Sequence, residues 1–363
     1  MNIYAKKDLW QYLSESDRPI VMYGMGNGAD KILKVCEKYG IEISDFFASD
    51  GFVRGHSFHG KVVLSYSAVK EKYAGQKPIV LLSFASSLDS VLDVIKTVSN
   101  EFELYAPDVP VFGETLFNFE FFNANKERFE KVYELLADDE SKSIYENVIN
   151  YKLTGDIKYL WRSESDKDSV YLDLLNAGSI RSYVDIGAYN GDTVRELLSY
   201  APSLESAIAL EPDARNFRKL SEYANTVSDK LDITCINAGA WCENTTLSFD
   251  ASGNRNAGII SSKDPSAKKS ETQTLTIDSI LQGKGADYIK YDVEGAEKEA
   301  VLGASETIKK HSPKLLISLY HRSEDMFALP ELLTSISSDY SLYIRRFRYI
   351  PAWDLNLYAI KNK

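Results

Sequence analysis

A carboxylate and a glycine turn lie together in residues 183–193, which read YVDIGAYNGDT. An apolar run ends at Asp185, and Gly187 and Gly191 precede a helix that we expect to begin near Thr193. Parallel α/β sheets bind nucleotides at such strand ends, but the dinucleotide fingerprint G-x-G-x-x-G is absent. Asp185 would repel a pyrophosphate, whereas it suits an α-ammonium group. A ligand with adenosine at one end and a cationic amino acid at the other fits these residues, and S-adenosylmethionine is such a ligand.

Two further strand ends supply the other contacts that this ligand needs. Glu211 ends the next apolar run, 20 residues after Gly191. An acid at that spacing can accept hydrogen bonds from both ribose hydroxyls. Asn237 and Ala238 end the third run, where small residues and a backbone turn can flank the adenine. We therefore predict that a cofactor site is lined by residues from these three strand ends: Asp185, Gly187, Gly191, Thr193, Glu211, Pro212, Asn237 and Ala238.

The residues with catalytic potential follow the fourth and fifth strands of the same segment. Asp292 ends one apolar run and His321 ends the next. Because both strand tips face the reactive end of a cofactor in a doubly wound sheet, we expect these two side chains to lie together. A histidine near its ordinary pKa of about 6.5 can accept a hydroxyl proton while a carboxylate orients it. His321 is predicted to be the base and Asp292 the orienting group. The neighbours predicted to contact substrate are Glu294, Tyr320 and Arg322.

Other roles stay open for these side chains. A histidine at a strand end is often a surface or structural residue. Asp292, Glu294 and His321 could also bind a divalent metal, but a histidine–carboxylate set this loosely spaced is weak evidence. No metal site is predicted.

A second glycine turn lies near the N-terminus. Gly24, Gly26 and Gly28 follow an apolar run and precede a helical pattern, and the next strand leads to Asp50. Backbone amides at the start of a helix can bind a phosphate, so these four residues are a candidate nucleotide site. Tight packing between a strand and a helix is the alternative explanation of the glycines.

The length, composition and net charge of the chain indicate which class of protein it belongs to. The chain has 363 residues, 44% of them hydrophobic, and a net charge of −11, so two domains with full-sized cores are expected and non-specific binding to nucleic acid is not. Three cysteines without a CxxC pair argue against a disulfide framework. The first residues lack a signal peptide's hydrophobic block, and no uncharged stretch approaches the about 18 residues of a membrane span. We predict a cytoplasmic protein without a membrane span.

These candidate residues need two α/β segments to position them. Strands alternate with helices in residues 1–113 and again in 171–363, which predicts two doubly wound Rossmann-like domains. Residues 114–170 show only helical spacing and are interpreted as a solvated connector. Arg345, Arg346 and Arg348 are interpreted as a solvated basic face, with contact to an anionic substrate as the alternative. The predicted strands of the C-terminal segment are 182–186, 207–210, 233–237, 288–292, 315–319, 340–344 and 355–360, with a hairpin or loop insertion at 245–278.

The C-terminal segment resembles the FkbM family of S-adenosylmethionine-dependent methyltransferases. The stretches that match are 184–193, 210–213, 237–241, 276–279, 289–297, 320–325 and 357–360. The resemblance implies a class I methyltransferase fold and O-methylation of a hydroxyl on a sugar, glycan or polyketide-type molecule. It also implies that Asp185, Gly187 and Glu211 hold the cofactor while Asp292 and His321 face the acceptor. Tyr291 departs from the family, where a smaller aliphatic residue is commoner.

The N-terminal segment is similar, more faintly, to the nucleotide-sugar-binding domains of bacterial sugar acyltransferases. We therefore predict an O-methyltransferase that uses S-adenosylmethionine and acts on a hydroxyl of a sugar, glycan or nucleotide-sugar. The alternative is a non-catalytic nucleotide or nucleotide-sugar binding protein with an inactive methyltransferase-like domain. A nicotinamide-dependent oxidoreductase is disfavoured because the C-terminal segment lacks the fingerprint.

Overall fold

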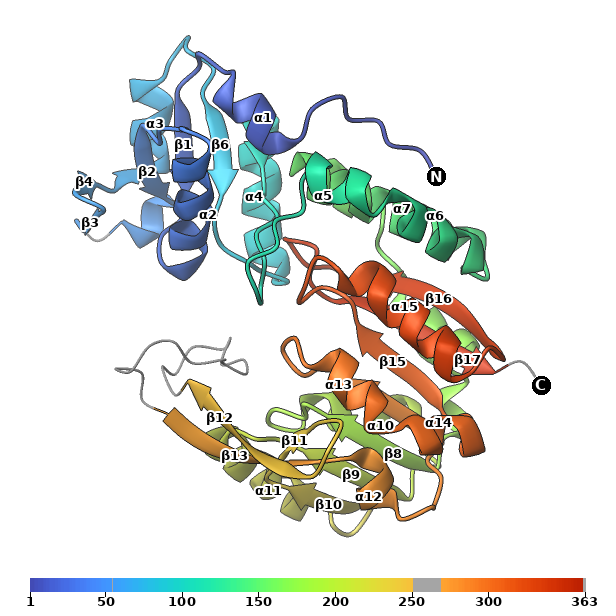
Figure 1. Cartoon of the computed structure of the whole chain (residues 1–363). Coiled ribbons are helices and arrows are strands. Elements are labelled where there is room, and N and C mark those ends of the chain that lie inside the picture. The colour runs from blue at the N-terminus through green and yellow to red at the C-terminus, as the bar shows by residue number, and fades with distance from the viewer. Residues whose placement is uncertain (54, 251–268, 362–363) are drawn as a thin grey trace.

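The structure is a computed structural model that describes residues 1–53, 55–250 and 269–361. Two α/β units lie at opposite ends of the molecule, and a group of helices joins them (Figure 1). The predicted fold class, two Rossmann-like sheets with a class I methyltransferase arrangement in the second, is confirmed.

The N-terminal unit is built on a five-stranded parallel sheet. Its elements are α1 (Leu9–Ser14), β1 (Ile20–Tyr23), α2 (Asn27–Lys38), β2 (Asp45–Ala48), a 3-10 turn (Asp50–Phe52), β3 (Ser57–Phe58), β4 (Lys61–Val62), β5 (Leu64–Ser65), α3 (Tyr66–Lys72), β6 (Ile79–Leu82), α4 (Asp89–Glu101) and β7 (Glu103–Tyr105). The strand order is β5-β2-β1-β6-β7. Val21 and Tyr23 of β1 pack with the core on the α4 side, and Ile20 and Met22 pack with the core on the α2 side. Helices on both faces explain why these strands are continuous apolar runs.

The connector is part of the hydrophobic core, so its interpretation as a solvated segment was wrong. Its helices are α5 (Phe119–Ala124), α6 (Lys126–Leu135), α7 (Asp139–Thr154), α8 (Lys158–Trp161), α9 (Lys167–Ser169) and a π-helical turn (Val170–Leu174). Phe129, Tyr145 and Val148 are completely buried. Arg345 and Arg346 are buried as well, which corrects their assignment to a solvated face. Arg345 donates to Asp138 at the start of α7 at 2.6 Å, so the connector is tied to the C-terminal unit.

The C-terminal unit carries a seven-stranded sheet. Its elements are a 3-10 turn (Ala177–Ser179), β8 (Ser182–Ile186), α10 (Asp192–Tyr200), β9 (Ser206–Leu210), α11 (Ala214–Thr226), β10 (Asp232–Ile236), β11 (Gly239–Ala240), β12 (Thr245–Asp250), β13 (Lys269–Leu275), α12 (Ile277–Leu281), β14 (Tyr288–Tyr291), α13 (Glu297–Leu302), α14 (Ser305–His311), β15 (Lys314–Ser318), α15 (Asp325–Ile336), β16 (Tyr340–Arg346) and β17 (Leu355–Lys361). The order β10-β9-β8-β14-β15-β17-β16 is parallel except for β17, which is antiparallel to both of its neighbours. The seven predicted strands are confirmed. The predicted insertion contains the antiparallel pair β12 and β13, and residues 251–268 between them lie outside the described part.

The carboxyl edges of the two sheets meet. Ser86, which follows β6, forms a bridge with Ile350, which lies between β16 and β17. The loop after β7 reaches the methyltransferase-like sheet, where the amide of Phe112 donates to the carbonyl oxygen of His321 at 2.9 Å. Ser323 donates to the carbonyl oxygen of Thr115 at 2.7 Å. Both glycine turns therefore belong to the region where the two units face each other.

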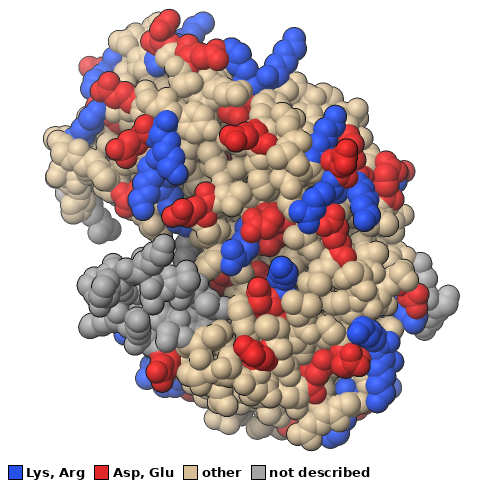
Figure 2. Space-filling model, in the orientation of Figure 1, with Lys and Arg blue, Asp and Glu red and all other residues tan. Residues whose placement is uncertain are grey.

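The surface carries charges of both signs. Acidic and basic side chains are interspersed over the face of the molecule that Figure 2 shows, without one broad region of a single sign. Among the described residues, no helix is both long enough and apolar enough to cross a membrane.

Candidate functional site

The glycine turn between β8 and α10 is fixed by contacts that leave no room for side chains. Gly187 has a φ of +83°, and a Cβ on it would overlap the carbonyl oxygen of Asp292. Gly191 has a φ of +82°, and a Cβ there would overlap the ring of Tyr223. Glycine tolerates both restrictions because it has no Cβ. Both glycines are therefore required by packing within the protein, and the close approach of this backbone to a ligand stays a prediction.

Asp185, at the end of β8, is completely buried and has partners within the protein. The hydroxyl of Thr193 donates to one of its carboxylate oxygens, and Nζ of Lys290 lies 3.4 Å from the other. Burial would lower the pKa of Lys290, but the carboxylates of Asp185 and Asp292 raise that pKa above its usual value. Lys290 is therefore charged, and Asp185 holds both the turn and this lysine. Contact between Asp185 and an ammonium group stays a prediction.

Glu211 lies directly after β9 and faces the same turn. Its carboxylate accepts hydrogen bonds from the amides of Tyr189 and Asp213, each at 2.9 Å. The side chain is buried, and burial raises the pKa of the carboxyl to about 7 although the two amides act in the opposite direction. The two amides fix this carboxylate next to the glycine turn, and its acceptance of hydrogen bonds from ribose hydroxyls stays a prediction.

The predicted adenine-flanking residues hold neighbouring loops together. The side-chain amide of Asn237 donates to the carbonyl oxygens of Glu211 at 2.8 Å and Pro212 at 3.1 Å. Ala238 is buried, whereas Pro212 is exposed. Asn237 therefore fixes the ends of β9 and β10 relative to each other, and its contact with a ligand stays a prediction.

The turn after β14 forms the acidic part of the site. Asp292 lies 3.7 Å from Nζ of Lys290 through Oδ2, and Oδ1 accepts a hydrogen bond from the hydroxyl of Tyr320 at 3.0 Å. Glu294 has a φ of +54°, in the left-handed region that non-glycine residues rarely adopt. The side chains of Asp292 and Glu294 are 30% and 48% exposed. These two carboxylates are thus reachable from outside, whereas Lys290 is buried behind them.

His321 is brought to this turn, as predicted, but its surroundings differ from the prediction. The side chain is completely buried. Nδ1 lies 2.8 Å from Oε1 of Glu297, and Nε2 lies 3.6 Å from Asp292 and 3.5 Å from Glu294. Burial would lower the pKa of the imidazole, but the carboxylates, Glu297 first, raise it to about 10. The expectation of an ordinary histidine pKa was therefore wrong, because the ring is enclosed by three acids rather than paired with one.

Tyr320 and Arg322 flank the histidine and both have internal partners. Nε of Arg322 donates to the carbonyl oxygen of Gly295 at 2.9 Å, and its guanidinium lies 4.1 Å from the ring centre of Phe112. A Cβ on Gly295 would lie 2.8 Å from the Phe112 ring. Phe112 comes from the N-terminal unit, so that unit contributes directly to the wall of the acidic turn.

The N-terminal glycine turn is explained mostly by packing. A Cβ on Gly28 would overlap the carbonyl oxygen of Ser83, and one on Gly24 would lie 2.6 Å from the Ser83 hydroxyl oxygen. Gly26 differs, because a Cβ there meets no described atom within 4 Å. Asp50 accepts from the amide and hydroxyl of Ser67 at 3.0 and 2.6 Å, so it supports the start of α3. Only Gly26, which precedes α2, keeps open space beside it.

Helix α2 of that turn faces the acidic turn of the other unit. Lys31 on α2 donates to the carbonyl oxygens of Pro110 and Val111 at 3.0 and 2.9 Å. Burial lowers the pKa of Lys31, and the nearby Glu294 acts in the opposite direction. The two candidate sites therefore lie on opposite walls of one inter-unit region.

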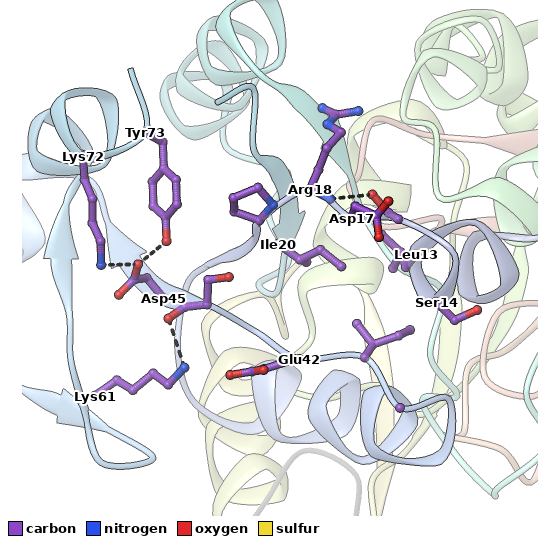
Figure 3. Close-up of a pocket in the computed structure, with 15 residues that line it drawn as sticks. Leu13, Ser14, Asp17, Arg18, Ile20, Glu42, Asp45, Lys61, Lys72 and Tyr73 are labelled. Atoms are coloured by element: carbon purple, nitrogen blue, oxygen red, sulfur yellow. Dashed lines mark hydrogen bonds and ion pairs between the residues drawn. The ribbon is translucent and has the colours of Figure 1, made fainter. Parts of the chain in front are cut away.

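A separate cavity of about 590 Å³ lies at the amino ends of β1 and β2, away from both turns. Figure 3 shows Lys72 and Tyr73 pointing at Asp45, which binds both of their polar groups. Lys61 donates to the carbonyl oxygens of Ile43 and Ser44. Because parallel α/β sheets bind ligands at the carboxyl ends of their strands, this cavity is not the candidate site.

Three residues of the site were not predicted from the sequence. A lysine inside an apolar strand could have indicated Lys290, because a buried ammonium needs carboxylate partners. Glu297 begins α13 in a run of acids, and the sequence does not distinguish it from Glu294. Phe112 carries no sequence signal, since its contact depends on how the two units pack.

Comparisons with known proteins agree with this geometry. Residues 185–349 match the family described as Methyltransferase FkbM domain. The crystal structure of a methyltransferase FkbM from Methylobacillus flagellatus is similar over 94% of this chain and 89% of its own, with 22% sequence identity and a TM-score of 0.71. An rRNA methylase from Streptococcus thermophilus is similar over 52% of this chain and 93% of its own, with 13% identity and a TM-score of 0.34. No protein with a curated description matches the sequence.

The matched range begins at Asp185 and includes Glu211, Asp292 and His321. The C-terminal unit is therefore similar to methyltransferase FkbM domains over residues 185–349, in line with the resemblance. The structure from Methylobacillus flagellatus shares the fold of nearly the whole chain, including an N-terminal unit before the methyltransferase domain. The likeness of that N-terminal unit to domains of sugar acyltransferases stays a prediction.

Proposed function

We propose that this protein, an S-adenosylmethionine-dependent methyltransferase, transfers the methyl group to a hydroxyl of a sugar, a glycan or a nucleotide-linked sugar. The observation that carries the proposal is the position of Asp292 and Glu294. They are partly exposed carboxylates at the carboxyl end of the central sheet, beside the turn that would hold the cofactor. A small or glycan acceptor that fills the inter-unit region would lie between these acids and α2.

The cofactor would be held by the residues that follow β8 and β9. Glu211 accepts hydrogen bonds from the ribose hydroxyls. The backbone of the turn at Gly187 and Gly191 lies close to the methionine part of the cofactor. Lys290 balances one of the two negative charges of Asp185 and Asp292, so the three groups keep a net negative charge, which would favour a cationic sulfonium nearby.

The proton of the acceptor needs a different route from the one predicted. His321 already carries a proton near neutral pH and is buried, so it supports the turn rather than receiving the hydroxyl proton. Asp292 accepts a hydrogen bond from the hydroxyl and directs its lone pair at the methyl carbon. Bound S-adenosylmethionine would supply the methyl group: the C–O bond would form as the C–S bond breaks, and the electron pair of that bond would pass to sulfur. The protonated ether is a much stronger acid than a carboxylic acid, so its proton can pass to Asp292.

Two features favour a polyhydroxylated acceptor that carries a phosphate. Carboxylates are good acceptors for several sugar hydroxyls, and Gly26 leaves the start of α2 open on the opposite wall. A twelve-residue helix presents amide donors and a partial positive charge at that end. A nucleotide-linked sugar would place its phosphates at α2 and its sugar at Asp292.

The test is methyl transfer from radiolabelled S-adenosylmethionine to a panel of free sugars, nucleotide-linked sugars and simple alcohols. Asp292→Asn should lower kcat by about 10²–10⁴-fold on the true acceptor, because the carboxylate is the proton acceptor. Glu306→Gln, which changes an exposed side chain on α14, is the matched control and should be unaffected. Transfer only to amines or carbon atoms, or full activity in Asp292→Asn, would overturn the proposal.

A further inference from the structure

A buried lysine joins the glycine turn to the acidic turn. Lys290 of β14 lies beside Asp185 of β8 in the register of the parallel pair. Asp292 follows two residues later, so its side chain lies on the same face of the sheet as that of Lys290. Nζ of Lys290 lies 3.4 Å from Oδ1 of Asp185 and 3.7 Å from Oδ2 of Asp292. One ammonium group is therefore placed between a carboxylate beside the glycine turn and a carboxylate of the acidic turn.

Packing alone does not explain a lysine at this position. Lys290 is 7% exposed. Tyr183 and Tyr288, which precede Asp185 and Lys290 on the same face of the two strands, stack on each other and belong to a hydrophobic core. An apolar side chain would fill such a place at least as well, because a buried ammonium loses its hydration. The lysine is therefore explained by the two carboxylates that it faces.

Asp292 is held at both of its carboxylate oxygens. Oδ1 accepts a hydrogen bond from the hydroxyl of Tyr320 at 3.0 Å and lies 3.6 Å from Nε2 of His321, while Oδ2 faces Lys290. Burial would raise the pKa of Asp292, but Lys290 first, then His321 and the hydrogen bond from Tyr320, hold that pKa below its usual value. A carboxylate can accept about four hydrogen bonds, so these contacts leave room for an acceptor hydroxyl.

The other titratable groups that surround Asp292 and its cationic neighbours are mostly acids. By element, they are Asp185 of β8, Asp192 of α10, Glu294 of the acidic turn, Glu297 of α13 and Asp354 before β17. Like charges favour the protonated form of a carboxyl group. Lys31 and Arg322 lie at the same turn, but they donate to backbone carbonyl oxygens. Since His321 is itself paired with Glu297, Lys290 has the largest part in keeping Asp292 charged.

We infer that Lys290 is a positioning residue of the methyl-transfer site, whose buried ammonium keeps Asp292 as a charged and oriented carboxylate and links it to Asp185. This inference rests on the proposed function, in which Asp292 receives the proton of the acceptor. That step needs an ionised carboxylate rather than a strong base, because a protonated ether is a much stronger acid than a carboxylic acid. A cation beside Asp292 therefore slows the proton transfer little, whereas protonation of Asp292 before methyl transfer would prevent it.

The test is the pKa of Asp292 itself, measured by an NMR titration of the aspartate carboxyl carbons in the full-length protein without cofactor or acceptor. The resonance of Asp292 is assigned by its absence from Asp292→Asn. Lys290→Met removes the ammonium but keeps a long unbranched side chain, and it should raise the pKa of Asp292 by about 1–3. Lys290→Arg keeps the positive charge and should reverse most of that rise. Lys284→Met, which changes an exposed lysine, is the matched control and should leave the pKa of Asp292 unchanged.

Turnover measures the catalytic consequence. With an acceptor in hand, the acidic side of the kcat profile should move to higher pH in Lys290→Met by the same amount as the pKa of Asp292, and kcat should recover as the pH rises. Lys290→Met also leaves two buried carboxylates without their cation. Where circular dichroism shows that this variant does not fold, the double variant Asp185→Asn, Lys290→Met retains only one of them and is compared with Asp185→Asn.

The outcomes separate this inference from the proposed function. An equal pKa of Asp292 with and without the lysine overturns the inference. A loss of turnover that is the same at every pH also overturns it, because the lysine would then only support the fold. A raised pKa of Asp292 without methyl transfer to any hydroxyl acceptor supports the link between Lys290 and Asp292 and contradicts the proposed function.

Discussion

Replacing Glu211 with glutamine tests the cofactor site through pH as well as affinity. Burial raises the pKa of this carboxyl from its ordinary 4.5 to about 7. At about 1.4 kcal/mol per pH unit, the ionised side chain is about 3 kcal/mol less favourable in the ligand-free protein than in water. Because the folded pKa is the higher one, this side chain lowers stability as the pH rises from 4.5 through 7. Between pH 5 and pH 8 its contribution should fall by about 2–3 kcal/mol, and Glu211→Gln should lack that change.

Cofactor binding should have the opposite pH dependence. Ribose hydroxyls donate to the ionised carboxylate, so S-adenosylhomocysteine should bind more tightly as the pH rises towards 7, by up to about tenfold per pH unit. Above that range the affinity should level off. Glu211→Gln loses charge-assisted hydrogen bonds worth about 1.5–3 kcal/mol, which weakens binding by about 10–150-fold at pH 8. The variant should also bind with little dependence on pH.

Urea unfolding at pH 5 and pH 8 measures the first effect, and calorimetry across pH 5.5–8 measures the second. Glu222→Gln, an exposed substitution on α11, controls for the loss of one charge. Calorimetry in two buffers with different ionisation enthalpies counts the protons released on binding. If Glu211→Gln keeps its affinity and follows the pH profile of the unaltered protein, the ribose does not bind at Glu211 and the reasoning fails.

Two further predictions concern packing. Gly28→Ala places a Cβ against the Ser83 carbonyl oxygen and should lower the free energy of unfolding by about 1–3 kcal/mol. The control Gly51→Ala meets no described atom within 4 Å and should change that free energy by less than about 0.5 kcal/mol. Equal stability of the two variants in urea would show that the close approach of Gly28 to Ser83 does not limit stability. Phe112→Ala removes the ring that packs on Gly295 and Arg322. The kcat/KM for the acceptor should therefore fall about tenfold or more, while the affinity for S-adenosylhomocysteine stays constant. A loss confined to cofactor binding would show that the ring acts elsewhere.

The fold was largely predictable because the buried parallel strands consist of consecutive apolar residues, which are visible in the sequence. The ends of β8, β9 and β14 follow within one residue from Asp185, Glu211 and Asp292, since a polar residue after an apolar run marks the edge of a sheet. The same pattern located the acids of the site. It did not reveal how the acids pair.

The errors come from contacts between distant segments. The helices of the connector have apolar residues at helical spacing, but spacing does not tell whether the remaining surface meets water or another unit. Arg345 is charged and yet buried because Asp138, 207 residues away in sequence, caps α7 and pairs with it. His321 was assigned one carboxylate partner, and the turn at Glu294 and the start of α13 add two more. Such partners are set by tertiary packing, which a local pattern does not encode.

The core described for the connector has a consequence for how the chain folds. One continuous set of buried residues runs from Val21 and Val80 in the first sheet, through Phe129 and Tyr145, to Ile289 in the second. Separating residues 1–113 from the rest would expose to water the apolar side chains through which this buried set passes from one unit to the other. We therefore expect the two sheets to unfold together, so that a substitution that loosens the first one lowers the population of the intact second site as well. Natural variation in the N-terminal half is thus constrained by the chemistry of the C-terminal half, whatever ligand each of them binds.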